Sequence, residues 1–183
     1  MFNKSIVLLF SIFTALLNIP MPAIAGGSFE NMEIFNEEGD VVRKYTLEDL
    51  KNEYEQNTIE TITPWSNNQE ILYRGPFLGD LLLRHNNTGG DDIEISAHNG
   101  FISGVKRSEI SQYAPILAVE RNCEPQDYIT EACADGQLFR PITIPENGPI
   151  FLVWPLKELP EYYLNMRNAI WVFHVSAIAH SKK

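Results

Sequence analysis

The stretch Gly148-Pro149-Ile150-Phe151-Leu152-Val153-Trp154-Pro155 decides the fold, because a short apolar run closed at both ends by proline is typical of a buried strand. A second stretch near the C-terminus, Ala169-Ile170-Trp171-Val172-Phe173-His174-Val175, carries similar bulky, β-favouring residues. We expect the two stretches to be adjacent buried strands, each with one tryptophan. Together they would form an apolar slot with an indole N–H, which is either plain core or the wall of a site for a flat aromatic ligand.

The N-terminus predicts an exported protein. Lys4 precedes a short apolar stretch, and Ala23-Ile24-Ala25 has the small residues of a cleavage site, so residues 1–25 are expected to be a secretory signal peptide. An uncleaved anchor is the alternative, although the apolar stretch is short for a bilayer. Cleavage after Ala25 would release residues 26–183 as a single domain into the periplasm, with no membrane insertion.

The charge of the chain excludes one class of partner. There are 24 acidic residues against 14 Lys and Arg, which gives a net charge of −10. Phosphate backbones and anionic lipids are bound by clustered Lys and Arg, and the sequence has no such cluster. We therefore expect no nucleic-acid partner.

Both cysteines lie in a polar stretch from Arg121 to Arg140 that shows no regular period. We expect this stretch to be a long loop, which in a compact domain is often functional, and it is a candidate partner surface or lid. In an oxidising compartment a disulfide between Cys123 and Cys133 is expected. A metal site there would need further ligands at suitable spacing, and the sequence places none nearby, so no metal is predicted.

Short strands and short helices follow each other along the chain without regular βαβ alternation, which predicts an α+β domain with a mixed sheet or small barrel. Thr46 and Asp49 predict a helix N-cap, Ser108 a second, and His98-Asn99-Gly100-Phe101 a turn. The expected strands are 32–35, 41–45, 59–63, 71–73, 93–97, 116–119, 150–153 and 170–178, and the expected helices are 46–53, 75–85, 108–113 and 156–166.

Several familiar catalytic motifs are missing from the sequence. There is no nucleophile elbow, phosphate-binding glycine loop or Walker lysine, so acyl transfer and nucleotide hydrolysis have no support. The histidines His85, His98, His174 and His180 include no two at metal-ligand spacing on one element. Only His98 leaves a strand in a glycine-containing turn, where binding groups concentrate.

Several short motifs occur in an order that resembles a known family. They are Tyr45-Thr46-Leu47-Glu48-Asp49-Leu50, Thr61-Ile62-Thr63-Pro64-Trp65, Tyr73-Arg74-Gly75-Pro76-Phe77-Leu78-Gly79-Asp80-Leu81-Leu82, Ala97-His98-Asn99-Gly100-Phe101, Ile116-Leu117-Ala118, the Gly148 to Pro155 stretch and Trp171-Val172-Phe173. Together they resemble the oxidoreductase molybdopterin-binding domain family. The resemblance runs from about Tyr45 to Val175 and implies the sulfite-oxidase fold.

The resemblance implies a pterin site without molybdenum. Enzymes of the family hold molybdenum through a pyranopterin and one cysteine thiolate, and the matching position falls near Thr61, whose hydroxyl is a poor substitute. The chain is also similar to a small exported branch, the periplasmic pterin-binding proteins of the PruR type. That likeness implies a non-catalytic protein that binds a reduced pterin and signals to a membrane-bound diguanylate cyclase/phosphodiesterase.

A pterin needs an aromatic platform and a few fixed polar groups at its edge. The expected faces and edges come from Trp65, Phe101, Trp154, Trp171, Arg74, His98 and Asn99. Trp154 and Trp171 could equally be core, and Arg74 could pair with a surface acid. Two other functions stay open: a molybdopterin-dependent oxidoreductase, and an interaction domain whose slot is closed.

Overall fold

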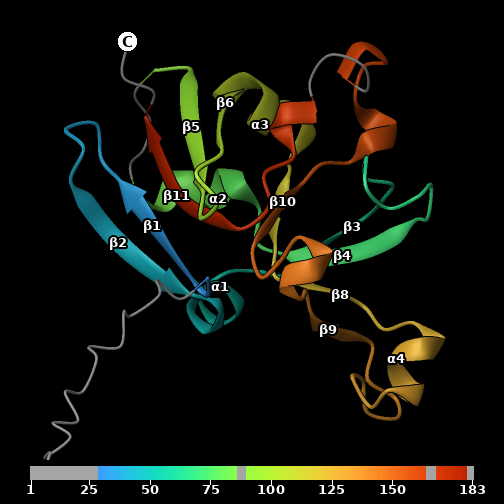
Figure 1. Ribbon diagram of the computed structural model, residues 1–183. Helices are drawn as coiled ribbons and strands as arrows, with labels where there is room; N and C mark the ends of the chain where they lie inside the picture. The colour runs from blue at the N-terminus through green and yellow to red at the C-terminus, as the bar shows by residue number, and fades with distance from the viewer. Residues whose placement is uncertain (1–28, 86–89, 164–167, 181–183) are drawn as a thin grey trace, which may run out of the picture.

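The computed structural model describes residues 29–85, 90–163 and 168–180, and in them short strands form three sheets accompanied by short helices (Figure 1). The predicted α+β class is confirmed. The barrel alternative is wrong, since none of the described sheets closes on itself. The predicted signal peptide, 1–25, lies outside the described residues. Within the described ranges, no helix is both long enough and apolar enough to span a bilayer.

The largest sheet has five strands in the order β2-β1-β11-β5-β6. These strands are β1 (Asn31–Phe35), β2 (Val41–Thr46), β5 (Asp92–Ala97), β6 (Ile102–Lys106) and β11 (Val175–His180). β1 and β11 run parallel and the other pairs antiparallel, so the sheet is mixed, as predicted. β6 was not expected: its inward positions are Ser103 and Val105, so only one apolar residue marks its buried face.

Two smaller sheets are antiparallel. One has four strands in the order β3-β4-β8-β9, and the other pairs β7 with β10. Their strands are β3 (Asn57–Thr61), β4 (Ile71–Gly75), β7 (Ile116–Ala118), β8 (Glu120–Asn122), β9 (Phe139–Pro141) and β10 (Phe151–Val153). Gly75 lets β4 approach β7 closely, because a Cβ there would lie 2.0 Å from the carbonyl oxygen of Leu117.

The helices are short. They are α1 (Leu47–Glu53), α2 (Leu78–Arg84), α3 (Arg107–Tyr113), α4 (Pro125–Ile129) and the 3₁₀ turns η1 (Ile144–Glu146), η2 (Leu156–Glu158) and η3 (Asn168–Ile170). The Thr46 cap of α1 is confirmed, with its hydroxyl accepting from the N–H of Asp49 at 3.1 Å. The Ser108 cap is wrong, since Lys106 is the N-cap of α3. The helix predicted over 156–166 is interrupted: η2 covers Leu156–Glu158, α-helical residues begin again at Tyr162 and Tyr163, and residues 164–167 lie outside the description.

The stretch from Gly148 to Pro155 forms the centre of the core. Every residue of β10 is buried, as predicted, but its strand partner is β7 and not the last strand. The C-terminal stretch still lies alongside, since Leu152 N–H donates to Val172 O at 2.7 Å. The final strand begins at Val175, later than expected, because His174 has a left-handed φ of 57° that interrupts an extended chain.

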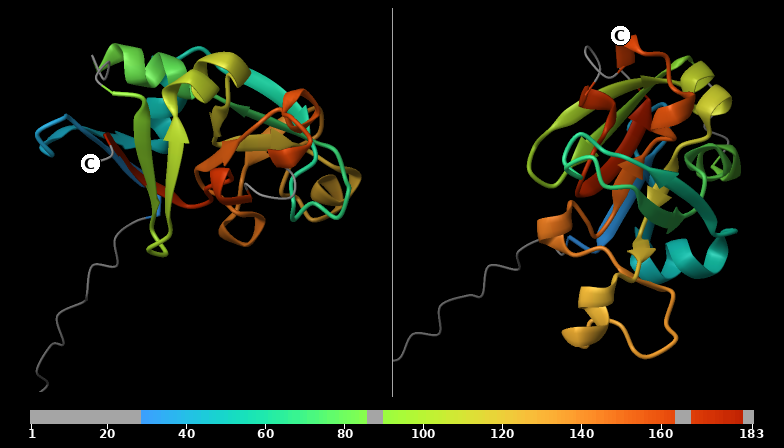
Figure 2. Two further views of the ribbon diagram at one scale, coloured as in Figure 1. Left: turned by 90° about the horizontal axis from the view of Figure 1, so that it is seen from above. Right: turned by 90° about the vertical axis from the view of Figure 1, so that its right-hand side faces the viewer.

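The stretch from Arg121 to Arg140 is not one irregular loop. It forms an arm in which β8 leads out, α4 follows, and β9 returns antiparallel to β8 (Figure 2). The predicted Cys123–Cys133 disulfide is confirmed, and such bonds persist in extracellular proteins. The sequence contains a start signal for helix α4, because Glu124 and Asp127 form a capping box and Pro125 lies in the first turn.

Candidate functional site

A cleft of about 420 Å³ opens where the loop after β3 meets β4, β8 and η1. Its walls come from segments far apart in the sequence, and most of its lining side chains are polar. They are Thr63, Trp65, Ser66, Asn67, Gln69, Ile71, Tyr73, Arg121, Pro145, Glu146 and Asn147. Of the predicted site residues, Trp65 alone is among them.

Trp65 stands at the cleft on a loop with two tight turns. The loop is closed by a hydrogen bond from Ser66 N–H to Thr63 O at 3.1 Å, and it bends at Asn67, whose φ is 52°. The indole is 45% exposed and meets the ring of Phe173 edge-on, with 5.3 Å between ring centroids. A flat, half-exposed aromatic face is therefore held in place beside polar groups.

Strand alternation decides which side chains of β4 and β8 reach the cleft. Tyr73 lies opposite Arg121, and both line the cleft, whereas Arg74 lies opposite Glu120 on the other face of the sheet. Arg74 Nε donates to the Glu120 carboxylate at 2.8 Å, and its guanidinium lies over the ring of Phe139 at 4.1 Å. Arg74, predicted as a ligand contact, is thus placed away from the cleft with an acid for a partner.

Charged side chains form a chain of alternating sign behind the cleft. Glu146 accepts from Arg121 Nη1 at 3.1 Å and from both Nη atoms of Arg140, at 2.6 and 2.7 Å. Arg121 also pairs with Glu124 at 2.6 Å, and Arg140 with Asp127 at 2.9 Å. Burial acts to raise the pKa of Glu146, but the hydrogen bonds from Arg140 and Thr143 and the charge of Arg140 together outweigh it and lower that pKa to about 2. The carboxylate is therefore ionised and the arginine pair neutralised.

Tyr73 supplies a neutral donor to the cleft. Its side chain is buried on β4, and burial, which disfavours the phenolate, raises its pKa to about 12. The hydroxyl therefore keeps its proton at neutral pH and can donate to a ligand oxygen or nitrogen.

The predicted turn residues His98, Asn99 and Phe101 do not line the cleft. His98 Nε2 lies 3.0 Å from Asn31 O, and Asn99 Oδ1 accepts from Phe101 N–H at 3.0 Å. A row of ring contacts leads from this turn towards the cleft, with centroids 5.0 to 5.5 Å apart. It runs through His98, Phe29, His174, Phe173 and Trp65.

The two remaining tryptophans are core residues. Trp154 is fully buried, and its Nε1 donates to Ile170 O at 2.9 Å. Trp171 is also buried, with its ring 6.3 Å from that of Phe151. Neither lines the cleft, so the core alternative for both is the one that their burial supports.

The position expected for a molybdenum ligand does not fit one. Thr61 is fully buried, and its hydroxyl accepts from Leu156 N–H at 3.0 Å and donates to Ile62 O at 3.3 Å. That hydroxyl is committed to holding η2 against β3. In the described part of the chain, no group of three or more His, Cys, Asp or Glu side chains is placed to hold a metal ion.

A comparison with known protein families and with curated proteins finds no match for this chain. The class that the fold and the cleft define is therefore a coarse one: an α+β protein with a disulfide-bonded arm and a polar cleft next to a tryptophan. Sequence reasoning missed Tyr73, Arg121, Glu146 and Asn147. Strand alternation could have paired the first two, but no local pattern connects them with η1.

Proposed function

We propose that this chain is an exported protein that binds a pterin without catalysing its conversion. The observation that carries the proposal is the half-exposed ring of Trp65, fixed against Phe173 at the mouth of a cleft lined by hydroxyls and amides. A flat heterocycle with donors and acceptors on its edge would stack on the indole and bond to the cleft wall.

The neutral side chains of the cleft would form the hydrogen bonds to the edge of the pterin ring. The two oxygens of Glu146 already accept five hydrogen bonds, from Arg121, from Arg140 twice and from Thr143 twice. A carboxylate has about four lone-pair positions, so Glu146 has no capacity left for a ligand. The side chains of Tyr73, Asn67 and Asn147 are better suited to pair with the ring edge.

The state of the charged groups supports binding over turnover. Arg121 and Glu146 neutralise each other, and a general acid or base would need a proton equilibrium near the working pH. The molybdopterin-dependent oxidoreductase is less well supported, since the Thr61 hydroxyl is committed to structure. The slot predicted between the two tryptophan stretches is packed as core, but a domain without any ligand site is less well supported, because a separate cleft beside Trp65 is open.

The reduced state of the pterin and the signalling partner come from the resemblance of the sequence motifs. On that basis the protein would report pterin availability to the extracytoplasmic part of a membrane-bound enzyme that makes or degrades cyclic di-GMP. Periplasmic placement agrees with the Cys123–Cys133 disulfide.

The test is to purify the protein from its exported fraction and to analyse it for bound small molecules and metals. We expect a fluorescent pterin in the extract released by heat, and submicromolar binding of tetrahydrobiopterin by calorimetry would be consistent with it. Molybdenum at one atom per chain would contradict the proposal in favour of the oxidoreductase. Absence of both pterin and binding would favour the closed-slot interaction domain.

A further inference from the structure

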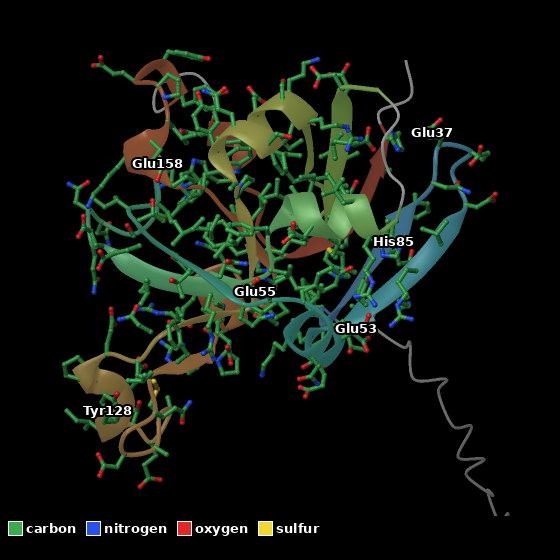
Figure 3. The ribbon with its side chains drawn as sticks, turned by 180° about the vertical axis from the view of Figure 1, so that it is seen from behind. Glu37, Glu53, Glu55, His85, Tyr128 and Glu158 are labelled. Carbon is green, nitrogen blue, oxygen red and sulfur yellow. A yellow bond between two sulfur atoms is a disulfide. The ribbon has the colours of Figure 1, made fainter. Side chains whose placement is uncertain are left out.

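We infer that the arm from Asn122 to Phe139 is the docking surface for the protein partner, and that the partner presents an apolar patch rimmed by Lys and Arg. This inference rests on the proposed function for the identity of the partner. The arm leaves the four-stranded sheet and carries α4, with the disulfide joining the end of β8 to the segment after α4. Figure 3 shows Tyr128 on this arm, well away from Glu37 on the β1–β2 hairpin.

The arm presents large apolar side chains to solvent. Ile129 is 74% exposed and Leu138 73%, and the ring of Tyr128 is also exposed. Apolar side chains gathered on one projecting element, rather than scattered singly, are typical of protein interfaces. An aromatic ring among them is the residue type that most often dominates binding energy.

The arm is rigid enough to act as a preformed surface. The disulfide joins Cys123 to Cys133, and Cys133 is buried. The Tyr128 hydroxyl donates to Gln137 O at 2.7 Å, and Asp127 pairs with Arg140 at the base. A preorganised surface loses little conformational entropy on binding, so its contacts contribute more of their energy to affinity.

Charge selects the occupant. Between Asn122 and Phe139 there are four acidic residues and no Lys or Arg, and two of the acids, Glu131 and Asp135, are exposed at the tip. A basic, apolar protein surface complements such a tip. A second copy of this chain is disfavoured by its own net charge of −10, and an anionic bilayer surface would repel the tip in the same way.

Ion pairs connect the arm with the cleft, which distinguishes it from the other exposed apolar positions of the described residues. Arg121 and Glu146 line the cleft, and the same two side chains begin the chain of ion pairs that continues through Glu124, Arg140 and Asp127 into the arm. A ligand that shifts Arg121 would therefore act directly on the base of the docking surface.

The test uses the full exported chain and the purified extracytoplasmic domain of the cyclic-di-GMP enzyme from the same organism. Binding is measured by interferometry for the wild type, for the double variant Ile129→Ala/Leu138→Ala and for Asp135→Lys. Leu83→Ala is the matched control, since Leu83 is 66% exposed on α2. Tetrahydrobiopterin binding is measured on every variant to show that the cleft is intact.

We expect the double variant to bind the partner domain about 30-fold more weakly, with Leu83→Ala and pterin affinity unchanged. Asp135→Lys should weaken the complex, and added salt should weaken the wild-type complex, because opposite charges attract across the interface. Equal partner affinity for wild type and arm variants would overturn the docking surface and leave the proposed function standing. If the wild type binds pterin but not the partner domain, the docking surface and the signalling part of the proposal both fall.

Discussion

Two tryptophans, each next to a proline, lie in opposite environments in this molecule. Trp154 precedes Pro155 at the end of β10 and is fully buried, with its N–H bonded to Ile170 O. Trp65 follows Pro64 on a loop and is 45% exposed, with one ring contact to Phe173. The same residue type in similar sequence surroundings is a core residue in one place and, in our proposal, a ligand face in the other. The two tryptophans differ in burial because of the strands that pack around each of them, and not because of their local sequence.

The largest expected effect is a loss of stability on substitution of the buried tryptophan. Trp154→Ala removes a fully buried indole, so we expect the free energy of unfolding to fall by about 3–5 kcal/mol, measured by denaturant titration. Trp154→Phe keeps a ring but leaves Ile170 O without its donor, which should cost about 1–3 kcal/mol. A Trp154→Ala protein with unchanged stability but lost pterin affinity would place Trp154 in the site.

Removal of the disulfide tests whether the arm is a stabilising unit separate from the cleft. The bond closes a loop with a sequence separation of 10, and the double variant Cys123→Ser/Cys133→Ser should lose about 2–3 kcal/mol of unfolding free energy. Neither cysteine lines the cleft, so the affinity for tetrahydrobiopterin should stay within about twofold of the wild type. A large loss of pterin affinity would contradict that separation.

Glu146 lies at the boundary between the two regions and gives a prediction in pH. Its pKa is lowered from 4.5 to about 2, so the stability from this ionised carboxylate is present above about pH 4.5 and is lost as the pH falls towards 2. Glu146→Gln leaves Arg121 and Arg140 without their shared anion and should cost about 2 kcal/mol at pH 7. Denaturant midpoints between pH 7 and pH 2 measure both effects.

The pH dependence of stability of the Glu146→Gln variant can also contradict this role of Glu146. The Glu146→Gln variant should show a smaller loss of stability on acidification than the wild type, because one carboxylate with a lowered pKa is gone. Asp127, whose pKa is also lowered, keeps part of the acid sensitivity in both proteins, since Arg140 pairs with it against the effect of burial. Parallel pH profiles for wild type and variant would show that Glu146 does not hold the cleft wall.

Much of the fold was predictable because its signals are local. The proline-bounded apolar run at Ile150 predicted a buried strand, and the Thr46 and Asp49 pair predicted a helix start. β6 was missed because Ser103 occupies a buried position and hides the apolar alternation. The last strand was placed too early because a left-handed φ at His174 cannot be read from a β-favouring sequence.

The candidate site was less predictable than the fold. Trp65 was found because an indole between a proline and a polar loop is an odd place for core. Arg74 was expected in the site, yet strand alternation places it with Glu120 on the opposite face of the sheet from Tyr73. Arg121 and Glu146 are 25 positions apart and meet only through the packing of η1 against β8, so no spacing rule brings them together.

The smallest stability change should accompany the most specific loss of function. Trp65→Ala removes a half-exposed ring with one aromatic neighbour, so the free energy of unfolding should change by less than about 1 kcal/mol. Tyr162→Ala, at an exposed aromatic side chain outside the cleft, is the matched control.

Calorimetric titration of the wild type, Trp65→Ala and Tyr162→Ala with tetrahydrobiopterin tests the central claim most directly. We expect Trp65→Ala to bind about tenfold more weakly or worse, and Tyr162→Ala to bind like the wild type, since only the first change removes the stacking face. Equal affinity of Trp65→Ala and the wild type would contradict the assignment of the cleft beside Trp65 as the pterin site.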